Sequence, residues 1–146
     1  MIKLQSIARQ VGEHDYMEEL FAAEVSTSDG LEGDFSALCR DGEIAVLSKE
    51  SWVKACHETD IELPWLAHGA HLLIKGFEFL PTDIGRMLRI GNVELEIARE
   101  HAPFAALEGQ APVLYEALLT GWRGGVVCRI LRSGNIQTGD NVDILD

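Results

Sequence analysis

Three cysteines are the first residues to consider, because a thiolate is both a nucleophile and a soft metal ligand. They are Cys39, Cys56 and Cys128. Cys39 stands beside Arg40 in a predicted loop and is the best candidate for a lowered pKa, although an incidental loop thiol is the simpler interpretation. Cys56 is followed by His57 on a predicted helix, where adjacent side chains point about 100° apart and make a poor ligand pair. Cys128 alternates with apolar neighbours and is best explained by core packing.

The number and spacing of these cysteines limit their structural roles. The count is odd, and no two of them form a Cys-x-x-Cys pair. We therefore expect neither a disulfide framework nor a structural zinc site, and a reducing cytoplasm is the natural setting.

Basic side chains form the second group with chemical potential. His68, His71 and His101 carry imidazoles, which donate to phosphate, ligate metals or exchange protons near neutral pH. Their spacing matches no HxH or HExxH metal signature, so unrelated surface histidines remain the simpler interpretation. Arg123 precedes Gly124-Gly125, where backbone N–H groups are suited to cradle phosphate, although a solvated arginine is equally compatible.

The composition of the chain limits what such groups can serve. Its 146 residues are 47% hydrophobic and 25% charged, which fits one globular domain spanning residues 1–146. The net charge of −12 disfavours nucleic acid and anionic membranes, whereas a local basic pocket can still hold a small anion. No apolar stretch is long enough to span a bilayer, and Lys3 and Arg9 interrupt any signal-like segment. We expect no nucleic acid, no membrane and a cytoplasmic location.

Short strands must position these groups. Apolar alternation or clustering predicts strands within residues 1–7, 43–47, 71–79, 86–99, 124–131 and 142–145. Ser48 is a predicted helix N-cap, Pro112 suits the first turn of a second helix, and the acidic segment from Glu13 to Glu24 is expected to hold a short helical turn. The pattern predicts a mainly β protein, a β-barrel or closed sheet with a few peripheral helices.

Several segments, taken in order, resemble the MOSC family, the domain also found at the C-terminus of pyridoxal phosphate-dependent molybdenum cofactor sulfurases. The segments are Gly30-Leu31-Glu32-Gly33-Asp34, Ile44-Ala45-Val46-Leu47-Ser48-Lys49-Glu50-Ser51-Trp52, Leu63-Pro64-Trp65, Leu72-Leu73-Ile74-Lys75-Gly76, Leu88-Arg89-Ile90-Gly91, Leu95-Glu96-Ile97, Trp122-Arg123-Gly124-Gly125-Val126, Gly134-Asn135-Ile136 and Gly139-Asp140. The resemblance implies a MOSC-type β-barrel. It also implies a link to molybdenum cofactor, through binding it, carrying its sulfur or using it to reduce N-hydroxylated compounds.

The chain departs from the family pattern at two places. Family members typically carry a cysteine after a proline just beyond the strand of Leu95-Glu96-Ile97, and here Pro103 is followed by Phe104. A phenyl ring neither accepts sulfane sulfur nor ligates a metal. The family also tends to carry arginine and asparagine before the strand of Leu72-Leu73, where this chain has His68-Gly69-Ala70-His71.

The resemblance would bring six residues to one cofactor mouth. They are His68, His71, Arg99, His101, Phe104 and Arg123. In this hypothesis Phe104 stacks or packs where sulfur chemistry occurs in other members, and the basic groups hold the phosphate of molybdenum cofactor (molybdopterin) or of a related anionic pterin or similar small ligand. No catalytic residue and no protein metal ligand is assigned.

Two alternatives stay open. The chain could be a molybdenum-cofactor-dependent reductase of N-hydroxylated compounds, served by a redox or cofactor-handling protein. It could instead be a protein-interaction module that has lost ligand binding and uses its acidic surface.

Overall fold

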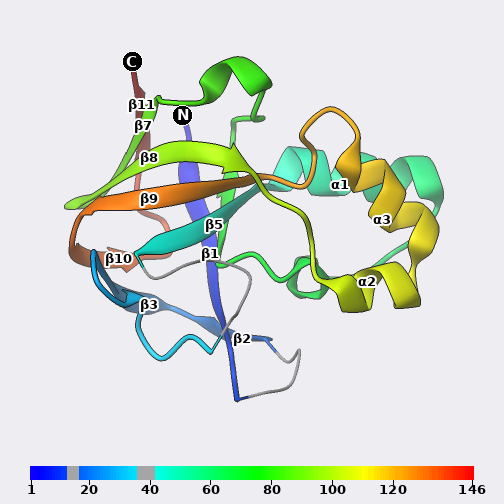
Figure 1. The fold of residues 1–146 in the computed structure, drawn as a ribbon, viewed down its shortest axis with the longest axis horizontal. Coiled ribbons are helices and arrows are strands. Elements are labelled where there is room, and N and C mark those ends of the chain that lie inside the picture. Colours follow the sequence, from blue (N-terminus) through cyan, green and yellow to red (C-terminus); the bar gives the residue numbers. More distant parts are fainter. Residues whose placement is uncertain (13–16, 36–41) are drawn as a thin grey trace.

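A computed structural model describes the chain except residues 13–16 and 36–41, and strands dominate it (Figure 1). Within the described residues the strands are β1 Lys3–Gln10, β2 Met17–Leu20, β3 Ala22–Ser26, β4 Gly30–Leu31, β5 Glu43–Ser48, β6 Leu72–Lys75, β7 Met87–Ile90, β8 Val93–Glu100, β9 Val126–Arg132, β10 Gly134–Gln137 and β11 Val142–Leu145. The helices are α1 Lys49–Thr59, α2 Ala105–Gln110 and α3 Pro112–Leu119, with the short 3₁₀ turns η1 Trp65–His68 and η2 Pro81–Asp83.

Two sheets carry these strands. The larger has the order β11-β7-β8-β9-β5-β6-β1-β2, and the smaller has the order β10-β3-β4. Neighbours in the larger sheet are antiparallel except β5 and β6, which run parallel. Parallel neighbours require a crossover connection, and α1 followed by η1 supplies it. The crossover therefore places α1 and His68 beside the same pair of strands.

The predicted mainly β class is confirmed, but closure into a barrel is not. Among the described residues, β11 and β2 remain the two edges of the larger sheet. The nearest approach to closure is a single bridge between Lys3 and Asn141. Three backbone hydrogen bonds flank it, from Leu4 N–H to the Asp140 carbonyl at 2.8 Å, from Gly139 N–H to the Leu4 carbonyl at 2.7 Å and from Val142 N–H to the Ile2 carbonyl at 2.9 Å. This contact reaches β1 rather than the edge strand β2, and it does not extend into a ladder.

Strand β5 is buried on both faces, which explains its almost continuous apolar sequence. Ile44 and Val46 belong to a core cluster enclosed by the strands. Ala45 and Leu47 belong to a second cluster that includes side chains of α1, α2 and α3. The helices lie together at one end of the sheet in Figure 1, so this second core is the layer between sheet and helices.

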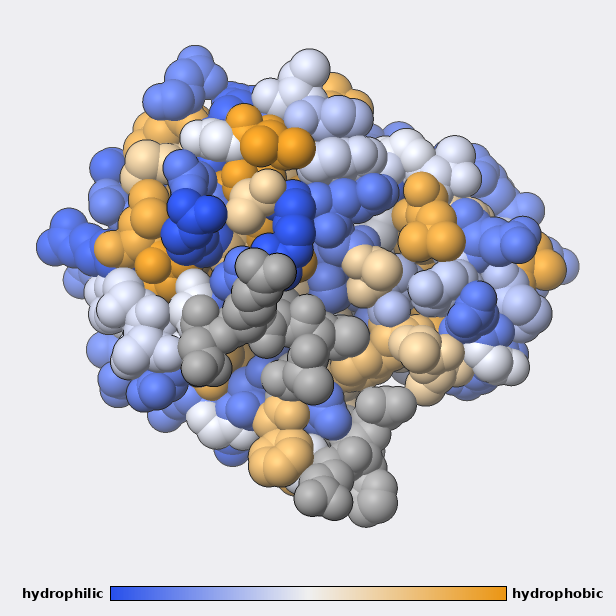
Figure 2. All heavy atoms as spheres, in the orientation of Figure 1, coloured by the Kyte–Doolittle hydropathy of each residue, from blue (hydrophilic) through white to orange (hydrophobic). Residues whose placement is uncertain are grey.

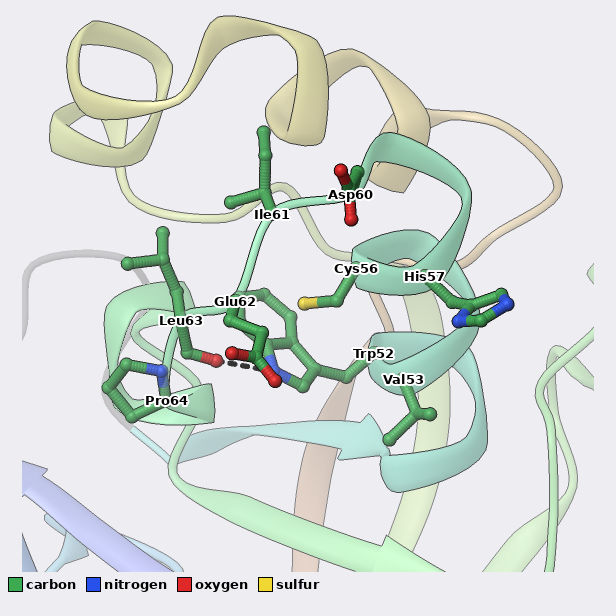
Figure 3. A pocket seen from close by; sticks show the side chains of 9 residues that line it. All are labelled: Trp52, Val53, Cys56, His57, Asp60, Ile61, Glu62, Leu63 and Pro64. Carbon is green, nitrogen blue, oxygen red and sulfur yellow. Dashed lines mark hydrogen bonds between the residues drawn. The ribbon is translucent and has the colours of Figure 1, made fainter.

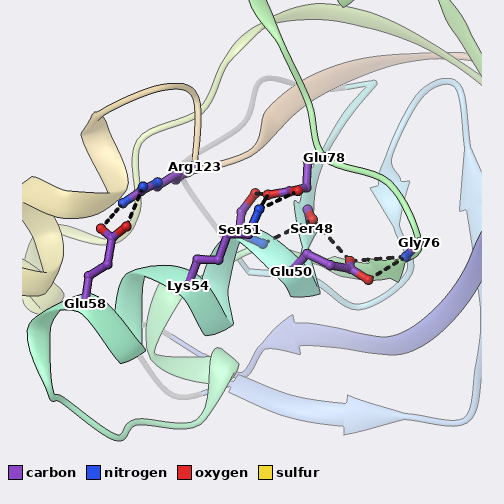
Figure 4. A network of polar contacts seen from close by, with 8 residues as sticks. All are labelled: Ser48, Glu50, Ser51, Lys54, Glu58, Gly76, Glu78 and Arg123. Carbon is purple, nitrogen blue, oxygen red and sulfur yellow. Dashed lines mark hydrogen bonds and ion pairs between the residues drawn. The ribbon is translucent and has the colours of Figure 1, made fainter.

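Helix α1 is fixed along its length by polar contacts (Figure 4). The predicted N-cap is confirmed, because the Ser51 N–H donates to Ser48 Oγ at 3.3 Å. The Glu50 carboxylate accepts from the Gly76 N–H at 3.0 Å, beyond the end of β6. Lys54 bonds Glu78 at 2.8 Å. These contacts hold α1 against β6 and the segment that follows it.

The helical turn expected between Glu13 and Glu24 is wrong in its described part. Residues 17–20 form β2, and residues 22–24 begin β3. Strand β2 pairs with β1 in a register that sets Arg9 opposite Glu18, and their side chains form an ion pair at 2.8 Å. Cross-strand pairing with a distant segment therefore determines the conformation here.

Hydrophilic residues surround separate hydrophobic patches on the face shown in Figure 2. This surface accords with a net charge of −12. No helix among the described residues is long and apolar enough to cross a membrane.

We predict that Gly125→Ala destabilises the fold far more than Gly139→Ala. Both glycines have positive φ, 86° and 94°, but a Cβ at Gly125 would overlap the carbonyl oxygen of Val46 in β5. A Cβ at Gly139 would meet nothing within 4 Å. Urea unfolding should show that the free energy of unfolding falls by at least about 3 kcal/mol in Gly125→Ala and by about 1 kcal/mol in Gly139→Ala. Equal losses would mean that β9 does not approach β5 as described.

Candidate functional site

His68 and His101 form a buried pair beneath the helices. His68 ends η1, and His101 follows β8, where its N–H donates to the Gly125 carbonyl at 2.9 Å. The side chains are 0% and 4% exposed, and their ring centroids lie 5.5 Å apart. Trp52 of α1 packs edge-on against His68 at a centroid distance of 6.0 Å. The structure therefore brings two of the predicted site histidines together, but in the interior.

Burial keeps both rings neutral at neutral pH. Desolvation lowers the pKa of His68 to about 4, and the nearby Gly124 carbonyl only partly opposes this shift. Desolvation, followed by repulsion from His68, lowers the pKa of His101 to about 2. Among the described residues, neither ring nitrogen of His68 nor Nε2 of His101 has a partner in hydrogen-bonding geometry. Neutral, enclosed imidazoles are not cationic anchors for a phosphate.

His71 has a structural role. Its Nδ1 accepts from the Ala45 N–H at 2.9 Å, which requires the proton to be on Nε2. Nε2 lies 2.8 Å from Oδ2 of Asp34 and donates to it, and the other Asp34 oxygen accepts from the Gln10 N–H at 2.8 Å. The ring thus ties β5 to the segment after β4, and both of its nitrogens are already used.

The two predicted site arginines are engaged with glutamates. Arg99 forms a bidentate pair with Glu43 at 2.7 and 2.9 Å. Arg123 reaches Glu58 at the end of α1, 2.9 Å away, and this pairing raises the pKa of Arg123 and lowers that of Glu58 (Figure 4). Arg99 is close enough to disfavour protonation of His101, whereas Arg123 is drawn towards α1.

Phe104 is a buried part of the core rather than an exposed surface for a ligand. It is 5% exposed, belongs to the second core, and its N–H donates to the His68 carbonyl at 2.9 Å. The ring lies directly on Gly69, where a Cβ would come within 2.6 Å of three ring carbons. Gly69 has a φ of 90° and no side chain, which permits this contact. The face of the ring that meets Gly69 cannot stack on a pterin.

Taken together, the residues present do not fit molybdenum cofactor. Phe104 offers no thiolate to molybdenum. His68 and His101 are neutral and enclosed, and Arg99 and Arg123 already have carboxylate partners. Among the described residues, no three His, Cys, Asp or Glu side chains are grouped to hold a metal ion.

A groove of about 700 Å³ lies beside Trp52 (Figure 3). It runs between α1 and the segment that follows it, and its volume is within the range of about 300–1,000 Å³ typical of small-molecule sites. Its apolar lining comprises Trp52, Val53, Ile61, Leu63 and Pro64. Its polar lining comprises Cys56, His57, Asp60 and Glu62.

The shape of the groove depends on how α1 ends. Asp60 adopts a left-handed conformation with φ 54°, and its N–H donates to the His57 carbonyl at 3.3 Å. The chain then turns back so that the Leu63 carbonyl accepts from the Trp52 indole N–H at 3.2 Å. Sequence reasoning missed this groove, and the only available signal was the apolar Ile61 and Leu63 next to a predicted helix end.

The described cysteines behave as unreactive thiols. Cys56 directs its sulfur into the groove while the His57 ring points away, so they are not a ligand pair, as predicted (Figure 3). Burial raises the pKa of the Cys56 thiol, and the carboxylate of Glu62 adds to this effect. Cys128 is fully buried in the strand core, which confirms its packing role. Cys39 lies outside the described residues.

Comparison with solved structures identifies the class of fold. The chain matches YuaD from Bacillus subtilis with a TM-score of 0.77 and 16% identity over 99% of this chain and 96% of that one. It matches YiiM from Geobacillus stearothermophilus with a TM-score of 0.74 and 16% identity over 100% and 76%. It matches YiiM from Escherichia coli with a TM-score of 0.67 and 12% identity over 99% and 68%.

These neighbours are MOSC-domain-like proteins, so the MOSC resemblance is supported at the level of the fold alone. No family model matches the sequence, and no curated protein matches it.

We predict strong energetic coupling between Gly69 and Phe104. Gly69→Ala should lower the free energy of unfolding by at least about 3 kcal/mol in the wild type, because the new methyl group overlaps the ring. In a Phe104→Ala background only the left-handed strain remains, about 1 kcal/mol. Denaturant unfolding of the four proteins measures both values. Equal losses in the two backgrounds would show that the ring does not rest on Gly69.

We also predict an acid-dependent loss of stability from the histidine pair. An unfolded histidine titrates near 6.5, but the folded pKa values are about 4 and about 2, so the unfolded state binds more protons as the pH falls. Stability is therefore complete above pH 6.5 and declines below it, by up to about 1.4 kcal/mol per pH unit for each histidine.

The free energy of unfolding, measured with urea between pH 7 and 4, should fall less steeply with decreasing pH in the double variant His68→Leu/His101→Leu than in the wild type. The matched control is His57→Leu, which removes an exposed histidine of α1 and should keep the wild-type slope. A double variant with the wild-type slope would place the acid sensitivity elsewhere.

Proposed function

We propose that this chain is a MOSC-fold domain that binds a small molecule without covalent sulfur chemistry. One observation carries the proposal: Phe104, which the resemblance aligns with the usual cysteine of the family, is packed into the core on Gly69. A side chain held there can neither carry a persulfide nor ligate molybdenum. In this proposal the fold is retained, and the buried side chain of Phe104 takes the place of the group that performs the family's chemistry.

The predicted anionic pterin receives little support from the charges. Arg99 and Arg123 are each neutralised by a bidentate glutamate, and transfer to a phosphate would leave Glu43 or Glu58 without its cation. Glu43 is only 9% exposed at its side chain, so losing its partner would be costly. Reduction of N-hydroxylated compounds is disfavoured for the same reason, because that reaction depends on the cofactor.

The groove beside Trp52 is the better ligand site. It is accessible, it combines an apolar wall with a few polar groups, and α1 holds one side of it rigidly through the contacts of Glu50, Lys54 and Glu58. A rigid wall reduces the entropy lost on binding. We assign the site to a reducing, cytoplasmic protein, in keeping with the free thiol of Cys56.

The test is the cofactor content of protein purified from a host that makes molybdenum cofactor. Wild type, Phe104→Cys and the cavity control Phe104→Leu are compared by elemental analysis and by fluorescence of oxidised pterin. We expect no molybdenum and no pterin in any of the three, because restoring the thiol leaves both arginines paired.

Molybdenum or pterin near one per chain in the wild type would overturn the proposal. Retention by Phe104→Cys alone would contradict the role given to the arginine pairs and would show that the lost thiol is the only obstacle.

A further inference from the structure

We propose that the groove beside Trp52 takes a small organic cation with an apolar body, such as an aryl- or alkylamine. This inference rests on the proposed small-molecule function and adds the chemical class of the ligand.

The apolar body would lie against one continuous surface. Ile61 and Leu63 project from the segment after α1, and Trp52 forms the wall on the α1 side. The indole is locked, because its N–H donates to the Leu63 carbonyl and its edge packs on His68. A fixed aromatic wall binds a flat or aliphatic group with little loss of side-chain entropy.

The charge of the ligand follows from two carboxylates in the lining. Asp60 and Glu62 form no ion pair with any described residue, in contrast to Glu58 and Glu78, which pair with Arg123 and Lys54. His57 is the only basic side chain of the lining, and its ring points away from the groove in Figure 3. A cation in the groove would be attracted by the carboxylates of the lining, whereas an anion would be repelled by them.

The remaining features of the site agree with a cation. The neighbouring Cys56 is kept as a neutral thiol, so it adds polarisable surface without further charge. The net charge of −12 gives the whole molecule a field that attracts cations to such a groove. A bare metal ion is a poorer occupant, because the described residues offer no group of three ligating side chains.

Three probes of similar shape and different charge test the inference at pH 7: 2-phenylethylamine, 2-phenylethanol and 3-phenylpropionate. Binding is followed by NMR through the indole N–H resonance of Trp52, assigned with Trp52→Phe. We expect the amine to bind about fivefold more tightly than the alcohol and the carboxylate to bind most weakly. The preference for the amine should shrink as salt is added.

Two double variants localise the effect. Asp60→Asn/Glu62→Gln should bring the amine to the affinity of the alcohol, and asparagine is well tolerated in the left-handed conformation of residue 60. The control Glu24→Gln/Asp143→Asn removes the same charge from exposed positions on β3 and β11, and it should keep the preference.

The outcomes separate the inference from the proposed function. If the alcohol or the carboxylate binds as tightly as the amine, the groove is a ligand site but the inference of a cation is overturned. Loss of the amine preference in the control variant as well would overturn it too, by assigning the effect to net charge. If no probe shifts the Trp52 resonance, both the inference and the groove as a binding site fall.

Discussion

The packing of Phe104 on Gly69 is the constraint on which the rest of the site depends. It joins the loop after β8 to the turn between η1 and β6, and the backbone hydrogen bond from Phe104 to His68 fixes the same junction. With the ring in place, His68 and His101 are sealed beneath the helices. A cysteine at this position would fill much less volume, and the surrounding apolar side chains would lose contacts that hold α2 and α3 against the sheet. The choice of phenylalanine or cysteine at position 104 therefore affects the packing of the helices as well as the chemistry.

The sealed histidines show what this packing costs. Three of their ring nitrogens have no hydrogen-bond partner in the described part of the chain, and each buried unsatisfied group is unfavourable by about 1–3 kcal/mol. His71, a few residues away, presents the opposite case, since both of its nitrogens are used in holding Ala45 and Asp34. The contrast separates a histidine that serves the fold from two that do not.

Local patterns in the sequence predicted the elements that local interactions determine. The hairpin of β7 and β8 around Gly91-Asn92, the Ser48 cap and the helix starting at Pro112 are all present, because a few neighbouring residues are enough to specify each of them. Strand β2 was missed, since its pairing with β1 depends on a partner elsewhere in the chain. The same limit applies to the site. Arg99 and Arg123 were expected to face an anion, but they find Glu43 and Glu58 at sequence separations of 56 and 65 residues. Spacing along the chain carries no information about such pairs.

Trp52 links the closed pocket to the open groove. The indole packs nearly perpendicular to the ring of the buried His68, and the same residue lines the groove. Because the indole is also bonded to the Leu63 carbonyl, it cannot move towards the histidines without releasing the segment that forms the opposite wall. Trp52 therefore connects the buried histidine pair to the lining of the groove, and its hydrogen bond to Leu63 joins α1 to the segment that follows it.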